Sequence, residues 1–218
     1  MTAAACAAFV LLGNWQTRRA EQKRALGAEL ERSLKSRPLE LRPGVDARLI
    51  QQRVAATGRF VAERTVLLDN KLRQGRPGYE VITPLALAGS DAAVLVNRGW
   101  VAAAPTRQQL PELRTPPGEV KVDGIALERL PHALAAGASS GPVRQNLDIG
   151  AYATESGLKL LPIVIEQHSD TGDGLLRDWP RPDLGIEKHE SYALQWYLFA
   201  GLAVILLVVL SFRRVGTA

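Results

Sequence analysis

The sequence contains a single cysteine, Cys6, among 218 residues, so no disulfide can form within the chain. Aromatic residues make up only 6%, and the 27 Lys and Arg exceed the 22 Asp and Glu by a net charge of +5. These basic residues are dispersed rather than gathered in a stripe, which argues against nucleic-acid binding. A hydrophobic content of 46% argues against a disordered chain and suffices for one domain with attached segments.

The common catalytic motifs are also missing. The chain has no P-loop, GxGxxG, CxxC, HExxH, GxSxG or EF-hand loop. A hydrolytic triad could be assembled from Ser139 or Ser140 with His168 and Asp170, but such residues on polar loops are usually solvated. We therefore predict no catalytic residue and no enzyme, and a membrane-tethered hydrolase is the least favoured function.

The apolar residues gather at the two ends of the chain. The run from Tyr192 to Phe212 has no charged residue, and its roughly 21 residues would span about 32 Å as a helix, the thickness of a bilayer core. Trp196 lies near one end and two arginines, Arg213 and Arg214, close the other. We predict a transmembrane helix over 188–212, followed by a cytoplasmic tail over 213–218.

The N-terminal apolar run, Thr2 to Gly13, would reach only roughly 18 Å as a helix. It could be a cleaved signal peptide, a short anchor or an ordinary amphipathic start. No basic residue precedes it, and Trp15 suits a membrane interface, so we favour an anchor over 1–20 that is incomplete as written. If both ends span, the arginine pair places both termini in the cytoplasm, although the basic cluster after the first run opposes the positive-inside rule.

The region between the anchors, 21–187, begins as a helix. Residues Trp15 to Ser36 are good helix formers, Pro38 is a stop, and Leu26, Leu30 and Leu34 form an apolar stripe. Short runs rich in β-branched and aromatic residues follow, and Asp148 to Ser156 predicts a capped helix before Gly157. We predict an α+β fold: a small, mainly antiparallel β domain with one or two helices, flanked by the two membrane helices. The predicted strands are Gln52–Phe60, Thr65–Leu68, Tyr79–Leu85, Ala93–Val101, Glu119–Leu127 and Leu161–Gln167.

His189 lies at the predicted membrane boundary. In a helix, His189, Tyr192 and Trp196 fall at i, i+3 and i+7, on one face. Neutral imidazole is a good axial ligand for haem iron, and basic side chains such as Arg18 and Arg19 could pair haem propionates. A helix-start histidine among interfacial aromatic residues is the alternative, and the residue chemistry alone favours that alternative.

Five ordered blocks together resemble a known family. Gly13-Asn14-Trp15-Gln16-Thr17-Arg18-Arg19 is similar to a Gly-x-Trp-Gln-x-x-Arg opening, and Val94-Leu95-Val96-Asn97-Arg98-Gly99-Trp100-Val101 is the most distinctive block. The other three blocks are Gly58-Arg59-Phe60, Pro77-Gly78-Tyr79-Glu80-Val81-Ile82-Thr83-Pro84-Leu85 and His189-x-x-Tyr192-Ala193-Leu194-Gln195-Trp196-Tyr197. Together the five blocks resemble the surfeit locus one family of bacterial type, membrane-anchored assembly factors of cytochrome c oxidase.

The resemblance implies a protein of the bacterial inner membrane with two spans, cytoplasmic termini and a periplasmic domain. It implies that haem a is a transient cargo delivered to oxidase subunit I, with haem a synthase as a second candidate partner besides membrane lipid. His189 matches the family's haem-linked histidine and would hold the iron. The predicted cofactor-binding residues are His189, Tyr192, Trp196, Trp15, Arg18 and Arg19.

The fourth block admits two interpretations. Gly99 interrupts a β run and suggests a bulge or a close backbone approach. Asn97, Arg98 and Trp100 could bind a partner, or could pair within the fold, which we favour for Asn97 and Arg98. The alternative function, from a different class, is a scaffold that stabilises an oxidase assembly intermediate by protein contacts without touching haem.

Overall fold

The computed structural model describes residues 2–41, 49–104, 106, 109–130, 141–179 and 184–215, of which 2, 3, 30 and 210–215 are described by their backbone alone. The chain divides into two compact units. The helical unit comprises Met1–Arg32 and Pro180–Ala218, and the β domain comprises Ser33–Trp179. The boundary between them falls inside helix α1, so the last turn of that helix belongs to the β domain.

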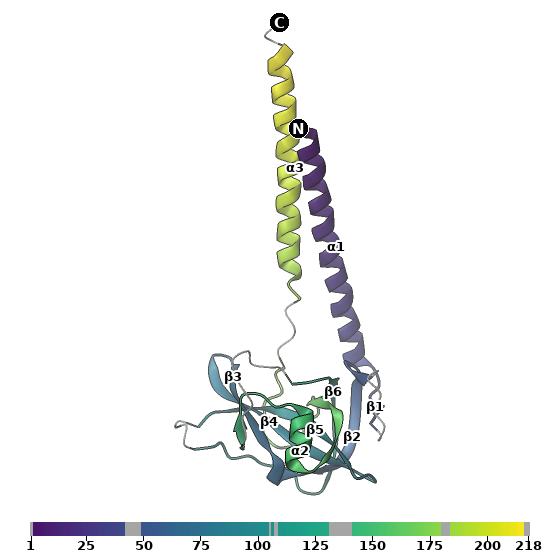
Figure 1. The fold of residues 1–218 in the computed structure, drawn as a ribbon, viewed down its shortest axis with the longest axis vertical. Helices are drawn as coiled ribbons and strands as arrows, with labels where there is room; N and C mark the ends of the chain where they lie inside the picture. Colours follow the sequence, from purple (N-terminus) through teal and green to yellow (C-terminus); the bar gives the residue numbers. More distant parts are fainter. Residues whose placement is uncertain are drawn as a thin grey trace. The chain divides into compact units, whose positions relative to one another are not determined.

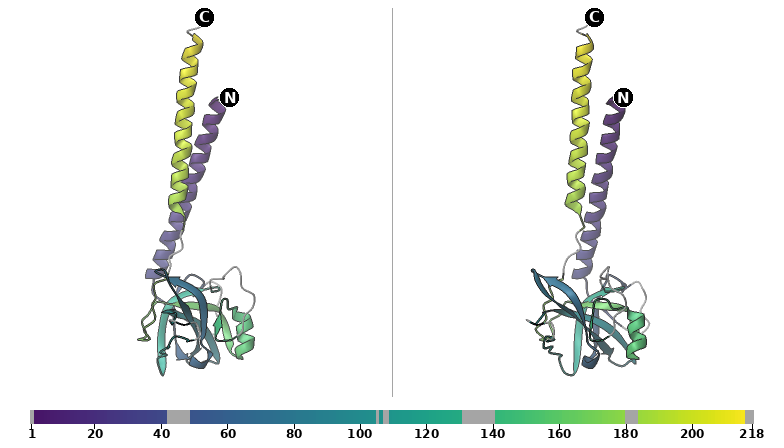
Figure 2. Two further views of the ribbon diagram at one scale, coloured as in Figure 1. Left: turned by 90° about the vertical axis from the view of Figure 1, so that its left-hand side faces the viewer. Right: turned by 60° about the vertical axis from the view of Figure 1, so that its left-hand side comes forward.

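Two long helices make up the helical unit. Helix α1 spans Thr2–Lys35 and helix α3 spans Ile186–Val215. They lie side by side in all the views of Figures 1 and 2. They are antiparallel, because Cys6 donates from Sγ to the Ala200 carbonyl whereas Lys23, further along α1, donates from Nζ to the Leu184 carbonyl, which lies just before α3.

The two helices meet along a seam of residues that recur at alternating spacings of three and four, the pattern of a two-helix coiled coil. The residues of this seam are buried or half-buried. Most are small, which lets two backbones approach closely, as in membrane helix pairs. The seam of α1 consists of Cys6, Phe9, Gly13, Gln16, Ala20, Lys23 and Gly27, and that of α3 of Ile186, His189, Ala193, Trp196, Ala200 and Ala203.

This seam differs from the leucine stripe predicted for the first helix. Leu26 is 52% exposed in the structure and does not belong to the buried face. Leu34 is half-buried, and the side chain of Leu30 lies outside the described residues. The apolar stripe of a helix is usually the face that packs against a neighbouring element. Here the small residues do so, because close approach of the two backbones decides the contact.

Helix α3 is long and apolar enough to cross a membrane over Ile186–Val209. This agrees with the C-terminal span predicted over 188–212, although the helix begins two residues earlier, at Ile186. Helix α1 is less clearly apolar and does not meet the same criterion over its described residues. It begins within the predicted first anchor and continues without a break to Lys35, three residues before Pro38.

The β domain is built on a sheet in the strand order β1-β2-β6-β8-β5-β4-β3-β7. Strand β2 also pairs with the end of β4, so β2, β6, β8, β5 and β4 close into a barrel, and β3 pairs with the first part of β4. Pairing is mostly antiparallel, and β5 and β8 are the parallel pair within the barrel. The strands are β1 (Leu39–Glu40), β2 (Arg53–Phe60), β3 (Val66–Arg73), β4 (Arg76–Leu87), β5 (Ala92–Ala102), β6 (Glu119–Leu127), β7 (Val143–Arg144) and β8 (Lys159–Gln167).

Alternating side chains of these strands fill the barrel, including Phe60, Val94, Val96 and Ile163. A second cluster on the outside of the sheet is covered by helix α2, Ile149–Ser156, whose Tyr152 is buried in it. The predicted Asp148 cap is confirmed, since its side chain accepts a hydrogen bond from the Ala151 amide.

Strand β5 contains a bulge at Arg98. In the pairing with β4, Asn97 lies opposite Ile82 and Gly99 opposite Val81, which leaves Arg98 as the extra residue. Gly99 has φ +141°, and a Cβ built there would lie 2.8 Å from the Leu176 carbonyl oxygen. The predicted bulge and close approach at this glycine are therefore both present.

The predicted α+β class is confirmed as a β domain with helices. The predicted strands correspond to β2, β3, β4, β5, β6 and β8, although β3 runs five residues further, to Arg73. The short strands β1 and β7 were not predicted, because two-residue edge strands carry no recognisable alternation.

Candidate functional site at the helix seam

The first and last sequence blocks meet in the helical unit. The ring of Tyr197 lies on Gly13, where an added Cβ would come within 2.6 Å of the ring atom Cε1. The Tyr197 hydroxyl donates to Asn14 Oδ1 at 2.8 Å and lies 3.3 Å from Thr17 Oγ1. These blocks are 180 residues apart in the chain, so their joint occurrence reflects one contact surface between α1 and α3.

His189 occupies a seam position in the first turn of α3, and its ring is half-buried. Its Nδ1 lies 2.6 Å from Oε1 of Gln16, on the facing seam of α1. Within the described part of the chain, Nε2 has no hydrogen-bond partner. The site thus presents an imidazole that is fixed through one nitrogen and open at the other.

The two flanks of the seam differ. One flank is closed by the Arg24–Glu190 ion pair and by the bonds of Tyr197. The helical repeat places Trp15 and Arg19 of α1 on the opposite flank, together with Tyr192 of α3. This second flank, defined by those three residues, is here called the open flank.

The open flank combines aromatic surface with positive charge. Trp15 is 47% exposed and Tyr192 52% exposed. The Arg19 guanidinium lies 5.9 Å from the Trp15 ring centroid, a cation–π distance, and also donates to Gln22. A shallow hollow of about 390 Å³ adjoins Tyr192 and is lined by Glu187, Lys188, Ser191 and Gln195.

The predicted haem-site residues are therefore distributed unevenly. His189 lies on the seam, with Trp15, Arg19 and Tyr192 on the open flank, whereas Arg18 is exposed at the helical position farthest from the seam. Trp196 stacks on Phe9, with centroids 5.9 Å apart and planes at 22°, and this contact packs the two helices together. Sequence reasoning missed Gln16, although it stands in the first block and repeats Phe9 and Lys23 at seven-residue spacing.

The predicted partner-binding residues of β5 have internal partners in the β domain. Arg98 is fully buried, with its guanidinium 4.7 Å from the Phe60 ring centroid. It donates to Asp173 Oδ2 at 3.0 Å, to Thr115 Oγ1 and to the Arg114 carbonyl. The bulge thus directs a cation into the barrel, where a loop carboxylate neutralises it.

The ionisation of this pair follows from its burial. Burial lowers the pKa of the Arg98 guanidinium, and the Asp173 carboxylate opposes that shift. Burial would raise the pKa of Asp173, but the hydrogen bonds and charge of Arg177, with hydrogen bonds from the Leu175 amide and Arg98, outweigh it, and the pKa lies below its ordinary value. The Asp173 carboxylate is therefore ionised at neutral pH, and it faces a guanidinium, a group that stays protonated in proteins.

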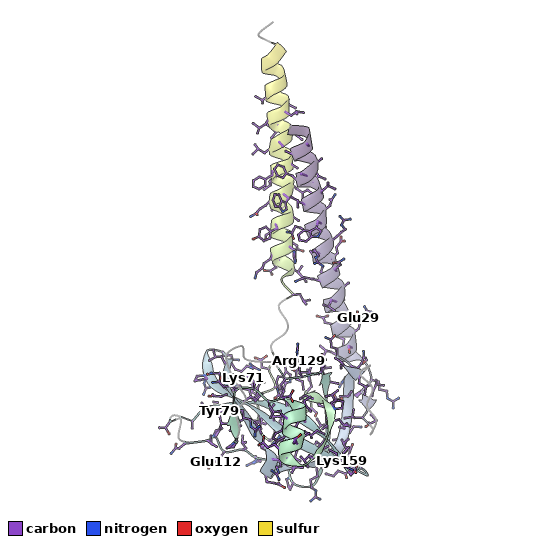
Figure 3. The ribbon with its side chains drawn as sticks, viewed as in Figure 1. Glu29, Lys71, Tyr79, Glu112, Arg129 and Lys159 are labelled. Carbon is purple, nitrogen blue, oxygen red and sulfur yellow. The ribbon has the colours of Figure 1, made fainter. Side chains whose placement is uncertain are left out.

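Asn97 and Trp100 are likewise engaged within the domain. Asn97 donates to the buried carboxylate of Glu80, which also pairs with Arg73 and with Lys71, labelled in Figure 3. The Trp100 indole donates to the Lys71 carbonyl at 2.7 Å. A partner-binding role for the three β5 residues stays a prediction, and the contacts present are those of a folded core.

The candidate hydrolytic residues do not form a site among the described residues. His168 contacts Glu166 and the ring of Trp179, and Asp170 accepts from the Gly172 amide. Ser139 and Ser140 lie outside the described residues.

Comparison with known proteins shows which family has this sequence. The model of the SURF1 family matches residues 3–201. The chain belongs to the SURF1 family. The match covers almost all of α1, the whole β domain and α3 as far as Gly201, so the resemblance predicted from the five blocks is confirmed.

Relatives in the SURF1 family come from distant organisms. A SURF1-like protein of Monosiga brevicollis is 29% identical over 94% of this chain and 83% of its own length. The cytochrome oxidase assembly protein SHY1 of Saccharomyces cerevisiae is 29% identical over 50% of this chain, which is 30% of the yeast protein. A SURF1-like protein of Rickettsia bellii is 30% identical over 42% of this chain and 38% of its own length.

Proposed function

We propose that this SURF1-family chain is a membrane-anchored assembly factor of haem–copper cytochrome oxidase that binds haem a and assists its delivery to subunit I. Family membership supports a role in oxidase assembly, since the yeast relative is named for that role. The observation that carries the haem assignment is the His189 imidazole, held through Nδ1 by Gln16 with Nε2 open. Neutral imidazole with one nitrogen so oriented is a suitable axial ligand for haem iron.

The open flank supports the same assignment. A haem is a flat apolar ring that carries two anionic propionates. Tyr192 and Trp15 offer exposed aromatic surface next to the seam, and Arg19 offers a guanidinium that can pair a propionate. Arg18 faces away from α3, so we assign the propionate contact to Arg19.

We further propose that both helices of the seam cross the bacterial inner membrane, with both termini in the cytoplasm and the β domain in the periplasm. The apolar stretch Ile186–Val209 supports a crossing by α3. The small-residue seam supports α1 as its membrane partner, because such seams are typical of packed membrane helices. His189 would then lie near the membrane surface, where a cargo could be exchanged between proteins.

The proposal can be tested by purifying the protein in detergent from cells that synthesise haem a. We expect a Soret band from bound haem and co-purification of oxidase subunit I. Subunit I without any Soret band would instead support a haem-independent scaffold. A preparation that contains neither haem nor subunit I would contradict the proposal.

A further inference from the structure

The contact between Gln16 and His189 is a direct polar pair inside a seam of small residues. The neighbouring seam positions Gly13, Ala20 and Ala193 are buried and carry little or no side chain. The two backbones therefore come close enough for Oε1 and Nδ1 to meet at 2.6 Å. Packing does not require an amide here, since apolar and small residues fill the rest of this seam apart from Lys23.

The chemistry of the pair limits the proton positions. An amide oxygen carries no hydrogen, so a hydrogen bond at this distance requires Nδ1 to donate. A neutral imidazole has one N–H, which leaves an unprotonated Nε2 with its lone pair available. The bond also fixes the plane of the ring, because it ties the imidazole to the facing helix.

We propose that Gln16 is a positioning residue that holds His189 in the Nδ1–H tautomer and so keeps Nε2 as the unprotonated donor atom for iron. The proposal rests on the proposed haem-carrier function for its purpose, whereas the tautomer is a property of the protein alone. Partners of this kind on the far nitrogen of a ligating histidine orient the ring and raise its affinity for metal.

Nearby charged groups do not compete for Nδ1. Glu190, the next residue along α3, pairs with Arg24. Lys23, one seam position from Ala20, donates its ammonium to the Leu184 carbonyl at 2.6 Å. Gln16 is therefore the acceptor that the structure gives to Nδ1, and a neutral one. A neutral acceptor donates less electron density to the ring than a carboxylate would, which suits a ligand that must release its cargo.

The test is nitrogen NMR of the full chain, labelled with ¹⁵N-histidine and embedded in lipid nanodiscs. The chain has three histidines, so comparison with His189→Ala assigns the signals of His189. We expect one neutral tautomer, protonated at Nδ1. Gln16→Met keeps the length of the side chain but loses the strong acceptor, and we expect a mixture of tautomers. Gln16→Glu keeps an acceptor oxygen and should restore the single tautomer.

Haem binding supplies a second readout. Gln16→Met should lower the affinity for added haem roughly 10- to 100-fold, the usual effect of losing such a partner. Gln16→Glu should retain haem and shift its midpoint potential downward, because a carboxylate makes the imidazole more electron-donating. Gln52→Met is the matched control: it makes the same substitution at an exposed position of the β domain and should change neither the tautomer nor the affinity.

Two outcomes separate this inference from the proposed function. A wild-type His189 protonated at Nε2, or unchanged His189 signals in Gln16→Met, overturns the positioning role whatever the haem content. Retention of full haem by His189→Ala overturns the assignment of His189 as the iron ligand. If Gln16→Met still shows a mixture of tautomers, the control of the His189 tautomer by Gln16 is nevertheless supported. The wild-type tautomer needs only the His189→Ala comparison for assignment, so this test remains valid if the Gln16 variants fail to fold.

Discussion

Gly13 supports Tyr197: the tyrosine ring lies where a side chain at position 13 would have to be. The tyrosine hydroxyl donates a hydrogen bond to the next residue of α1, Asn14. This contact joins the first and last sequence blocks and sets the separation of α1 and α3. The position of Gln16 opposite His189 depends on that separation, since Gly13 and Gln16 are neighbouring seam positions of α1.

We expect Gly13→Ala to weaken the packing of the two helices, because the new Cβ would lie 2.6 Å from the Tyr197 ring. Overpacking of this kind costs about 1–3 kcal/mol. Hydrogen exchange of α1 backbone amides in detergent measures the effect as faster exchange. Gly201→Ala is the control, since nothing lies within 4 Å of a Cβ at that helical glycine. Equal exchange in both variants would contradict the packing role of Gly13.

Asp173→Asn should strongly destabilise the β domain. It removes the carboxylate that pairs with the buried Arg98 and with Arg177, leaving an uncompensated cation inside the barrel. Breaking a buried ion pair in this way costs about 3–5 kcal/mol. The measurement is urea unfolding of the full chain, followed by hydrogen exchange in β5.

The matched control for this prediction is Asp91→Asn. Asp91 pairs with Lys159, labelled in Figure 3, but both side chains are more than 70% exposed. Surface pairs of this kind contribute little to stability, and we expect no measurable change. Similar unfolding midpoints for the two variants would show that the Arg98–Asp173 pair does not stabilise the barrel.

The same carboxylate predicts an acid-sensitive β domain. The pKa of Asp173 lies below its ordinary value in the folded protein, so its contribution to stability is complete above the unfolded-state pKa of about 3.9. That contribution is lost as the pH falls below about 4 and the carboxylate takes up a proton. Urea midpoints measured from about pH 5 to about pH 3 should fall more steeply in the wild type than in Asp173→Asn. Parallel pH profiles would contradict the assignment.

Arg53 should stabilise the C-terminal end of α1. Its guanidinium forms a two-bond pair with Asp123 at 2.9 and 3.0 Å and donates to the carbonyls of Leu34 and Ser36. A cation at this end of a helix satisfies free carbonyls and complements the helix dipole. We expect Arg53→Met to cost about 1–2 kcal/mol and to speed amide exchange over residues 33–36. Arg59→Met, on the same strand, is the comparison, and equal effects would argue against the capping role.

The sequence was sufficient to predict the β domain and insufficient to predict how its charged residues pair. Val94 and Val96 alternate with the side chains around them, which predicts a strand and an inward face. Arg98 continues the inward row, but its acidic partner Asp173 lies 75 residues further along the chain. Contacts at that separation depend on the topology of the barrel, which no local pattern contains.

The residues of the helix seam could not be predicted from the sequence, for a different reason. Hydrophobicity favoured Leu26 as a buried residue, whereas the structure buries Gly13 and Ala20 instead. Close backbone approach in such a pair selects small residues, which hydropathy ranks low. The position of His189 at a helix start could be predicted from sequence, but its partner Gln16 could not, because that requires knowing which faces of α1 and α3 meet.

The most direct test of His189 as the haem ligand is the haem stoichiometry of purified His189→Ala, read from the Soret band of protein isolated from cells that make haem a. His168→Ala is the control, because His168 lies in the β domain, beside Glu166 and Trp179. We predict that His189→Ala loses the bound haem and that His168→Ala retains it. A full complement of haem with an unchanged spectrum in His189→Ala would contradict the account.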